Sequence, residues 1–270
     1  MAVVVGILLA AATIYLSALT LLVATQRSKV FPASDIRPDL AATSGADDLR
    51  EILIDGEDGY TLISWFAPAK RADHRTIIYF HGNAGNIASR VQRVIPYLAL
   101  GYGILLVGYP GYGGNPGRPS EQAFYRTAGA NLDFLQAQGI AGDRLILFGE
   151  SLGTAVAIQM ATERQALALI LEAPLASVRL SAQARYPLLA HDVLVRDKFA
   201  SINKIAQVHV PLLIVHGGLD RTTNVRFGRM LFERANQPKQ AFFPATAGHN
   251  DLMQHGMPET VIDFLNRVKT

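Results

Sequence analysis

Eight short apolar runs, each bounded by Gly, Pro or Asp, recur along the chain after about residue 48. Their length and bulk are typical of strands. They are Glu51 to Ile54, Tyr60 to Phe66, Thr76 to Phe80, Gly103 to Val107, Leu145 to Phe148, Ala168 to Leu171, Leu212 to Val215 and Ala241 to Phe243. From the third run onward they alternate with segments of helical periodicity at Ile87 to Leu100, Glu121 to Ala137, Thr154 to Glu163, Arg226 to Arg234 and Pro258 to Val268. This alternation predicts an α/β fold with a mostly parallel eight-stranded sheet, helices on both faces and an antiparallel start.

The first 24 residues carry no charged side chain. A helix from Ala2 to Ala24 would be about 34 Å long against a hydrocarbon core of about 30 Å, so this segment can span a bilayer. A cleaved signal peptide is the alternative, but no Lys or Arg precedes the apolar run and no clear A-x-A cleavage site follows it. Basic residues follow the span at Arg27, Lys29 and Arg37, so the positive-inside rule predicts a single-pass membrane protein with the rest of the chain in the cytoplasm.

We therefore expect a transmembrane anchor at residues 1–24, a linker at residues 25–48 and one α/β domain at residues 49–270. Within the domain, Ala176 to Gln207 lies between two predicted strands and is longer than an ordinary connection, which predicts a small cap at the carboxyl edge of the sheet. The apolar stretch Tyr186 to Val195 in this cap could pack internally, bind an acyl chain or touch the membrane.

The chain has no cysteine, which excludes a thiol nucleophile, structural disulfides and a thiolate metal site. Its net charge of +3 comes from 25 basic and 22 acidic residues spread along the chain, without a Lys/Arg block. This distribution argues against a nucleic-acid partner and fits mild attraction to an anionic membrane surface. The sequence has no HExxH or similar ligand spacing, so it predicts neither a metal nor an organic cofactor.

The polar residues of most chemical interest follow directly after predicted strands, where sites form in open parallel sheets. Ser151 lies in GESLG, at a corner between a strand and a helix that its flanking glycines allow to be sharp. The third predicted strand is followed by the sequence HGNAGN. The seventh is followed by HGGLD, which ends in Asp220, and the eighth by ATAGHND, which contains His249. Acyl transfer by a serine requires a hydroxyl, an imidazole, a carboxylate and backbone amides, and these four strand ends supply that set.

Each assignment has an alternative. Ser151 could simply cap the following helix. Glu172, after the sixth strand, is a rival to Asp220 because a carboxylate there could reach the same imidazole, and Asp220 could be only a helix cap. His255 competes with His249, and Glu150 is a neighbour of the nucleophile more plausibly than a general base.

The chain resembles the α/β-hydrolase superfamily in several motifs taken together. These are the chain order Ser, Asp, His, the GESLG elbow, HGNAGN, and GYPGYGGNPGRPSE from Gly108 to Glu121. Within it they resemble the membrane-anchored abhydrolase-domain proteins of the bud-emergence type, over about Glu51 to Lys269. The resemblance implies that Ser151 is the nucleophile, Asp220 the acid and His249 the base, and that the backbone amides of Asn83 and Leu152 form the oxyanion hole. Such proteins often have Asp in place of Gly108 and Pro in place of Asn224, and neither departure removes a catalytic atom.

These observations support an enzyme: a membrane-anchored serine hydrolase that cleaves ester or thioester bonds of a small-molecule or lipid-like substrate. A peptidase or amidase would use the same triad. A catalytically silent interaction module on the same fold is the second class of function. The enzyme is favoured because nucleophile, base, acid and oxyanion loop are all present in the sequence.

Overall fold

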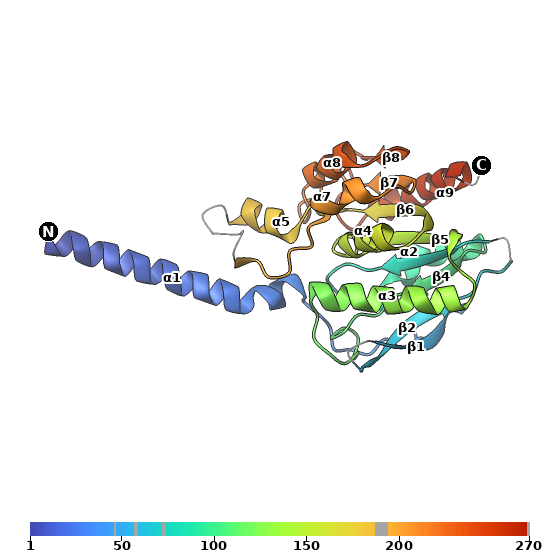
Figure 1. Cartoon of the computed structure of the whole chain (residues 1–270), viewed down its shortest axis with the longest axis horizontal. Helices are drawn as coiled ribbons and strands as arrows, with labels where there is room; N and C mark the ends of the chain where they lie inside the picture. The colour runs from blue at the N-terminus through green and yellow to red at the C-terminus, as the bar shows by residue number, and fades with distance from the viewer. Residues whose placement is uncertain (46, 57–58, 72–73, 187–193, 269–270) are drawn as a thin grey trace.

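The fold is an eight-stranded, mostly parallel sheet with helices on both faces and one long helix that projects from the domain (Figure 1). The computed structural model describes residues 1–45, 47–56, 59–71, 74–186 and 194–268. The strands are β1 (Arg50–Asp55), β2 (Thr61–Ala67), β3 (Thr76–Phe80), β4 (Gly103–Leu106), β5 (Gly142–Glu150), β6 (Ala166–Glu172), β7 (Leu212–Val215) and β8 (Lys239–Phe242). The longer helices are α1 (Ala2–Val30), α2 (Val91–Ala99), α3 (Glu121–Ala137), α4 (Gly153–Glu163), α5 (Val178–Arg185), α8 (Val225–Arg234) and α9 (Met257–Val268). Short helical turns are η1 (Ile87–Arg90), α7 (Ser201–Lys204), η2 (Ile205–Gln207) and η3 (Leu252–His255).

The strand order is β1-β2-β4-β3-β5-β6-β7-β8, and the sheet is parallel except for the pairings of β2 with β1 and β4. Every residue of β3, β4 and β7 is buried, because both faces of these central strands are covered. This explains their continuous apolar sequences. The register pairs Glu150 with Glu172 and Val215 with Phe242, so the carboxyl ends of neighbouring strands reach the same edge of the sheet. The predicted α/β sheet and its antiparallel start are confirmed.

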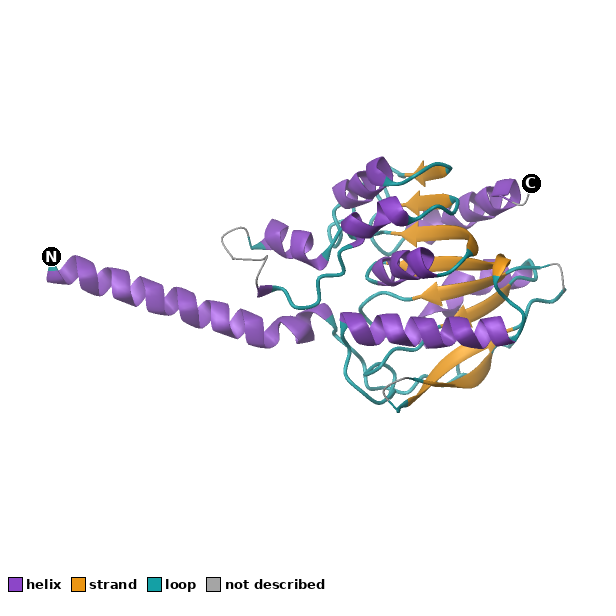
Figure 2. Cartoon of the chain, in the orientation of Figure 1, coloured by secondary structure: helices purple, strands orange, loops and turns teal. Residues whose placement is uncertain are grey.

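Helices cover both faces of the sheet (Figure 2), and an apolar core lies between sheet and helices on each face. One contains Phe124 of α3 and Val156 of α4, and the other contains Val94 of α2 and Phe264 of α9. All four side chains are at most 5% exposed. The helices thus fix the sheet from both sides and hold its carboxyl edge in place.

Helix α1 is long and apolar enough to cross a membrane. It continues without a break from Ala2 to Val30, so the first six residues of the predicted linker are helical. Phe31 then enters the core of the domain, with its ring centroid 5.3 Å from that of Phe124 and 6.0 Å from that of Phe199. The helix is therefore attached directly to the domain.

The predicted cap region contains α5 and α7. Helix α5 begins after Ser177, whose hydroxyl accepts a hydrogen bond from the Leu180 amide at 3.0 Å. The predicted apolar stretch Tyr186 to Val195 lies largely outside the described residues, which end at 186 and resume at 194. Helix α5 lies beside the inner end of α1, away from the sheet (Figure 1).

Candidate active site

Ser151 occupies a sharp corner between β5 and α4. Its φ of +50° lies in the left-handed region, which a residue other than glycine adopts at a cost of about 1–3 kcal/mol. A Cβ at residue 149 would lie 2.5 Å from Thr154 Cα, and one at residue 153 would lie 2.0 Å from the Phe80 carbonyl oxygen. Only glycine fits at these two positions, so the elbow expected from GESLG is present. Leu152, not Ser151, is the N-cap residue of α4, which speaks against a simple capping role for Ser151.

Asp220 and His249 come from the loops after β7 and β8 and are in direct contact. The Asp220 Oδ2 atom is 2.7 Å from His249 Nδ1, and Oδ1 accepts hydrogen bonds from the Thr222 and Thr223 amides at 2.8 Å. The two loops touch closely, since a Cβ at Gly217 would lie 2.2 Å from the Gly248 carbonyl oxygen. This packing holds the carboxylate against the imidazole.

The buried ring of His216 adds a further donor to the same carboxylate. Its Nε2 atom lies 2.8 Å from the Thr223 carbonyl oxygen and 3.2 Å from Asp220 Oδ2. Both neighbours are acceptors, so Nε2 carries the proton. Burial alone would raise the pKa of Asp220, but the hydrogen bonds from His216 and His249 outweigh it and hold that pKa well below its usual range. Asp220 is thus kept ionised beside His249.

Glu172, the rival acid, has a different partner. Its carboxylate is fully buried and forms an ion pair with Arg93. Burial raises the pKa of Glu172, while the Arg93 guanidinium opposes that rise. The structure therefore brings Asp220 against His249 and places Glu172 against a cation. His255, the rival base, lies in η3 with Nε2 3.7 Å from Asp251 Oδ2.

The expected oxyanion amides belong to two loops that are in contact. A Cβ at Gly82 would lie 3.3 Å from Ser151 Cβ, so the loop that carries Asn83 packs against the elbow that carries Leu152. The Asn83 carbonyl oxygen accepts a hydrogen bond from the Tyr112 hydroxyl at 2.8 Å, and its side-chain amide donates to the Val30 carbonyl oxygen at 3.1 Å. Within the part of the chain that the structure describes, neither the Asn83 nor the Leu152 backbone N–H donates to a protein acceptor.

Arg90 joins the same two loops and was not singled out from the sequence. Its Nε atom is 2.8 Å from Glu150 Oε2, and its Nη2 atom is 3.2 Å from Glu150 Oε1 and 2.9 Å from the Ala84 carbonyl oxygen. Burial opposes ionisation of Glu150, but the Arg90 guanidinium outweighs it and lowers the pKa of that carboxyl. Glu150 is therefore an ion-paired neighbour of the nucleophile, and Arg90 holds the loop of Asn83 against the elbow. The available signal was the spacing of Arg90 and Arg93, which are three residues apart within the predicted helix Ile87 to Leu100.

The edge of the sheet thus carries a hydroxyl, an imidazole paired with a carboxylate, and two backbone amides that have no acceptor among the described residues. Covalent acyl transfer by a serine uses these groups. Among the residues that the structure describes, no group of three or more His, Asp and Glu side chains is placed to hold a metal ion.

A sequence profile described as alpha/beta hydrolase fold matches residues 75–201. An uncharacterized protein of Mycobacterium tuberculosis is 34% identical over 223 residues, which cover 82% of this chain and 79% of that protein. The alpha/beta hydrolase domain-containing protein 17B of Homo sapiens is 31% identical over 199 residues, covering 72% of this chain and 65% of that protein.

Solved structures share the fold at low sequence identity. An esterase of Pyrococcus furiosus superposes with a TM-score of 0.71 at 17% identity, over 89% of this chain and 97% of that chain. An acetyl xylan esterase of Paenibacillus superposes with a TM-score of 0.67 at 18% identity, over 81% of this chain and 83% of that chain.

Proposed function

The chain belongs to the α/β-hydrolase superfamily, and from that premise we propose that it is a membrane-anchored serine hydrolase that cleaves ester or thioester bonds. The observation that carries the proposal is the contact of 2.7 Å between Asp220 Oδ2 and His249 Nδ1 at the same sheet edge as the strained Ser151 elbow. The esterase neighbours agree with an ester substrate, although their low identity supports the fold alone.

In the proposed acylation step, Ser151 Oγ attacks the substrate carbonyl carbon while His249 Nε2 accepts the hydroxyl proton. Asp220 accepts the hydrogen bond of His249 Nδ1 and offsets the positive charge on the ring. The backbone N–H groups of Asn83 and Leu152 donate to the oxyanion, where each such donor contributes roughly 3–4 kcal/mol. His249 then returns the proton to the leaving alcohol or thiol, and an acyl ester of Ser151 remains.

Deacylation repeats these roles with water. His249 takes a proton from a water molecule, which attacks the acyl carbon, and the same two amides stabilise the second oxyanion. Collapse of this intermediate releases the carboxylic acid and returns the proton to Ser151 Oγ. The cycle consumes one water molecule and restores all three side chains.

The proposal also places the enzyme at a membrane. Helix α1 would be the single transmembrane span, and the catalytic domain would lie in the cytoplasm because basic residues follow the uncharged run. Arg27 and Lys29, in the last turn of α1, suit the polar headgroup region at the end of such a span.

Hydrolysis by the purified full chain in detergent micelles tests the proposed reaction. We expect release of p-nitrophenol from p-nitrophenyl butyrate or of thiol from a butyryl thioester, and loss of this activity in Ser151→Ala. Hydrolysis of a p-nitroanilide in preference to both would identify an amidase. Absence of all three activities in a folded, detergent-solubilised protein would instead favour a catalytically silent module.

A further inference from the structure

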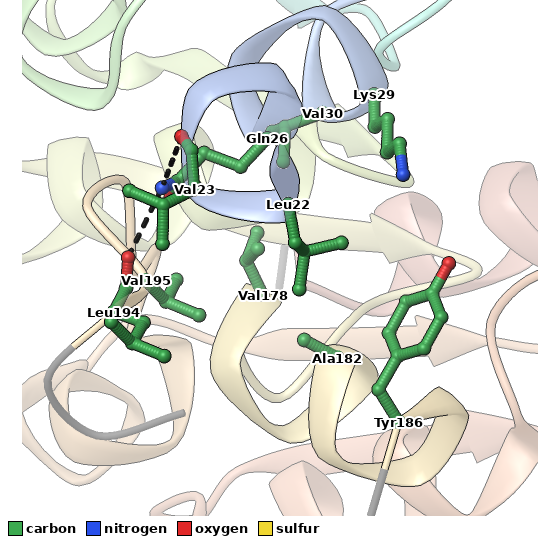
Figure 3. Close-up of a pocket in the computed structure, with 10 residues that line it drawn as sticks. All are labelled: Leu22, Val23, Gln26, Lys29, Val30, Val178, Ala182, Tyr186, Leu194 and Val195. Carbon is green, nitrogen blue, oxygen red and sulfur yellow. Dashed lines mark hydrogen bonds between the residues drawn. The ribbon is translucent and has the colours of Figure 1, made fainter. Parts of the chain in front are cut away.

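An apolar pocket lies between the inner end of α1 and the cap helix α5 (Figure 3). Leu22, Val23 and Val30 line it from α1, and Val178, Ala182 and Tyr186 line it from the α5 side. Leu22 and Val30 are eight residues apart, as are Val178 and Tyr186, so each set forms a stripe along one helix face. The cavity has a volume of about 110 Å³.

Polar contacts at the rim fix the two walls relative to each other. The Gln26 side chain donates to the Leu194 carbonyl oxygen at 3.1 Å and accepts from the Arg196 amide at 2.9 Å (Figure 3 shows the first of these bonds). Arg27 forms an ion pair with Asp197 at 2.9 Å, and the other oxygen of Asp197 accepts from the Glu121 amide at 2.9 Å. The pocket is therefore held between elements that are tied to the domain.

The pocket extends from the membrane-spanning part of α1 towards the candidate active site. Leu22 belongs to the uncharged run at the amino end, whereas the Val30 carbonyl oxygen accepts the side-chain hydrogen bond of Asn83. Eight residues of helix separate these two points, which is about 12 Å, or about the length of an extended chain of eight to ten carbons. One end thus lies at the level of the bilayer and the other beside the loop with the proposed oxyanion amide.

We propose that this pocket binds the acyl chain of the substrate, which enters from the bilayer along α1. The inference rests on the proposed function and adds to it a substrate class, an ester or thioester of an aliphatic acid of about eight to ten carbons. An apolar cavity offers water few hydrogen-bond partners, so an aliphatic chain is the ligand that suits this lining. The bond to be cleaved would lie at the Asn83 end, next to Ser151.

Chain-length dependence tests the proposal. For the full chain in detergent micelles, KM for p-nitrophenyl esters should fall by up to about fourfold for each methylene that enters the pocket. The fall should continue from butyrate to octanoate or decanoate and then stop. Ala182→Phe fills the pocket and should lower the ratio of kcat/KM for octanoate to that for butyrate by at least about tenfold.

Ala184→Phe is the matched control, because Ala184 lies on the same helix, is exposed and does not line the pocket. This variant should keep the wild-type ratio. Ala182→Asn adds a polar group to the pocket without the bulk of a phenyl ring. It should also lower the ratio of kcat/KM for octanoate to that for butyrate, and it serves as the test if Ala182→Phe does not fold. A wild-type ratio in folded Ala182→Phe and Ala182→Asn would overturn the proposal.

A binding measurement separates this inference from the proposed function. If the wild-type chain hydrolyses no ester, a diazirine-labelled decanoic acid should still cross-link to peptides from α1 and α5 in Ala184→Phe and fail to do so in Ala182→Phe. Equal cross-linking in both variants would overturn the pocket assignment. Cross-linking of a photoreactive phosphatidylcholine from nanodiscs, together with flat chain-length dependence, would show a site for bilayer lipid and would also overturn the assignment to substrate.

Discussion

Two carboxylates at the edge of the sheet, Asp220 and Glu172, have opposite surroundings. Asp220 accepts hydrogen bonds from His216, His249 and two backbone amides, whereas Glu172 is buried against Arg93. If Asp220 is the acid of the triad, Asp220→Asn should lower kcat by roughly 10³ to 10⁴ with little change in KM. The amide keeps the shape but loses the charge that offsets the imidazolium.

Glu172→Gln is the matched comparison, because it makes the same chemical change on the neighbouring strand. It should lower kcat less than about tenfold, and its main effect should be a loss of about 1–3 kcal/mol in the free energy of unfolding, since the partly buried Arg93 would lose its charged partner. Steady-state kinetics and denaturant unfolding of both variants measure these effects. A large kcat loss in Glu172→Gln and a small one in Asp220→Asn would reverse the assignment.

His81 makes the stability of the domain dependent on pH. Its ring is fully buried beside Tyr109 and Tyr112, and this burial lowers its pKa from 6.5 to about 3. Between pH 6.5 and about pH 3 the unfolded chain therefore binds more protons than the native chain. The stability that a neutral His81 contributes is fully present above pH 6.5 and is lost as the pH falls below that value. Between pH 7 and pH 5 the loss from this residue should be about 2 kcal/mol.

His81→Asn removes the titrating group and should reduce the difference in unfolding free energy between pH 7 and pH 5 by about that amount. The variant can be less stable at both pH values, so the difference is the informative quantity. The fluorescence of Trp65, the single tryptophan of the chain and fully buried, reports the unfolding. An unchanged difference would contradict a neutral, buried His81.

The candidate catalytic side chains could be proposed from the sequence because each follows a strand with a recognisable pattern. The roles of Arg90 and Arg93 could not be assigned from the sequence. Their roles depend on the register that places Glu150 beside Glu172, and no local pattern specifies which buried carboxylates lie next to each other. The bond from His216 to Asp220 could not be assigned either, because it depends on the geometry of the loop after β7.

At the scale of elements, α1 is both a membrane-spanning candidate and part of the domain. Its inner end supplies the Arg27–Asp197 ion pair and the Val30 carbonyl that accepts from Asn83, and it leads into Phe31 in the core. Deletion of residues 1–24 keeps these contacts and should release the protein from membranes while kcat for a butyrate ester stays within about threefold of wild type.

Deletion of residues 1–31 removes the contacts as well and should lower both kcat and stability. Loss of a buried phenylalanine side chain alone costs about 3–5 kcal/mol. Carbonate extraction, thermal melting and butyrate hydrolysis of the two truncated chains distinguish the roles. Equal activity and melting temperature in both would show that α1 contributes nothing to the site, and retention of the shorter deletion in washed membranes would contradict anchoring by α1.

The elements themselves followed closely from the hydrophobic pattern. The bounds of β3, β7 and α3 match the prediction, because fully buried strands and a capped amphipathic helix leave clear signals. Helix α1 extends beyond its apolar segment because Gln26 to Lys29 are compatible with a helix. Pro32 is the first residue that disfavours helical backbone in the residue before it. Strand β5 is longer at both ends than its apolar run, since pairing with β6 extends it to Gly142 and Glu150.

At the scale of the molecule, the attachment of α1 places the candidate active site close to the point where the chain would leave the membrane. The strand order could not be read from the hydrophobic pattern, because it depends on which strands pair across the sheet. The resulting architecture brings the carboxyl ends of β3, β5, β7 and β8 to one edge of the sheet, and α1 projects from the domain on that side (Figure 1). If the proposed function is correct, the site would therefore face substrates delivered by the bilayer.

The most direct test of this account is covalent labelling of the nucleophile. A fluorophosphonate probe reacts with a serine activated by a neighbouring base and leaves a stable phosphonyl ester on its Oγ atom. The full chain in detergent micelles should be labelled, the modified peptide should contain Ser151, and Ser151→Ala should abolish the label without lowering the melting temperature by more than a few degrees. Labelling at a different residue, or equal labelling of the folded Ser151→Ala variant, would contradict the account.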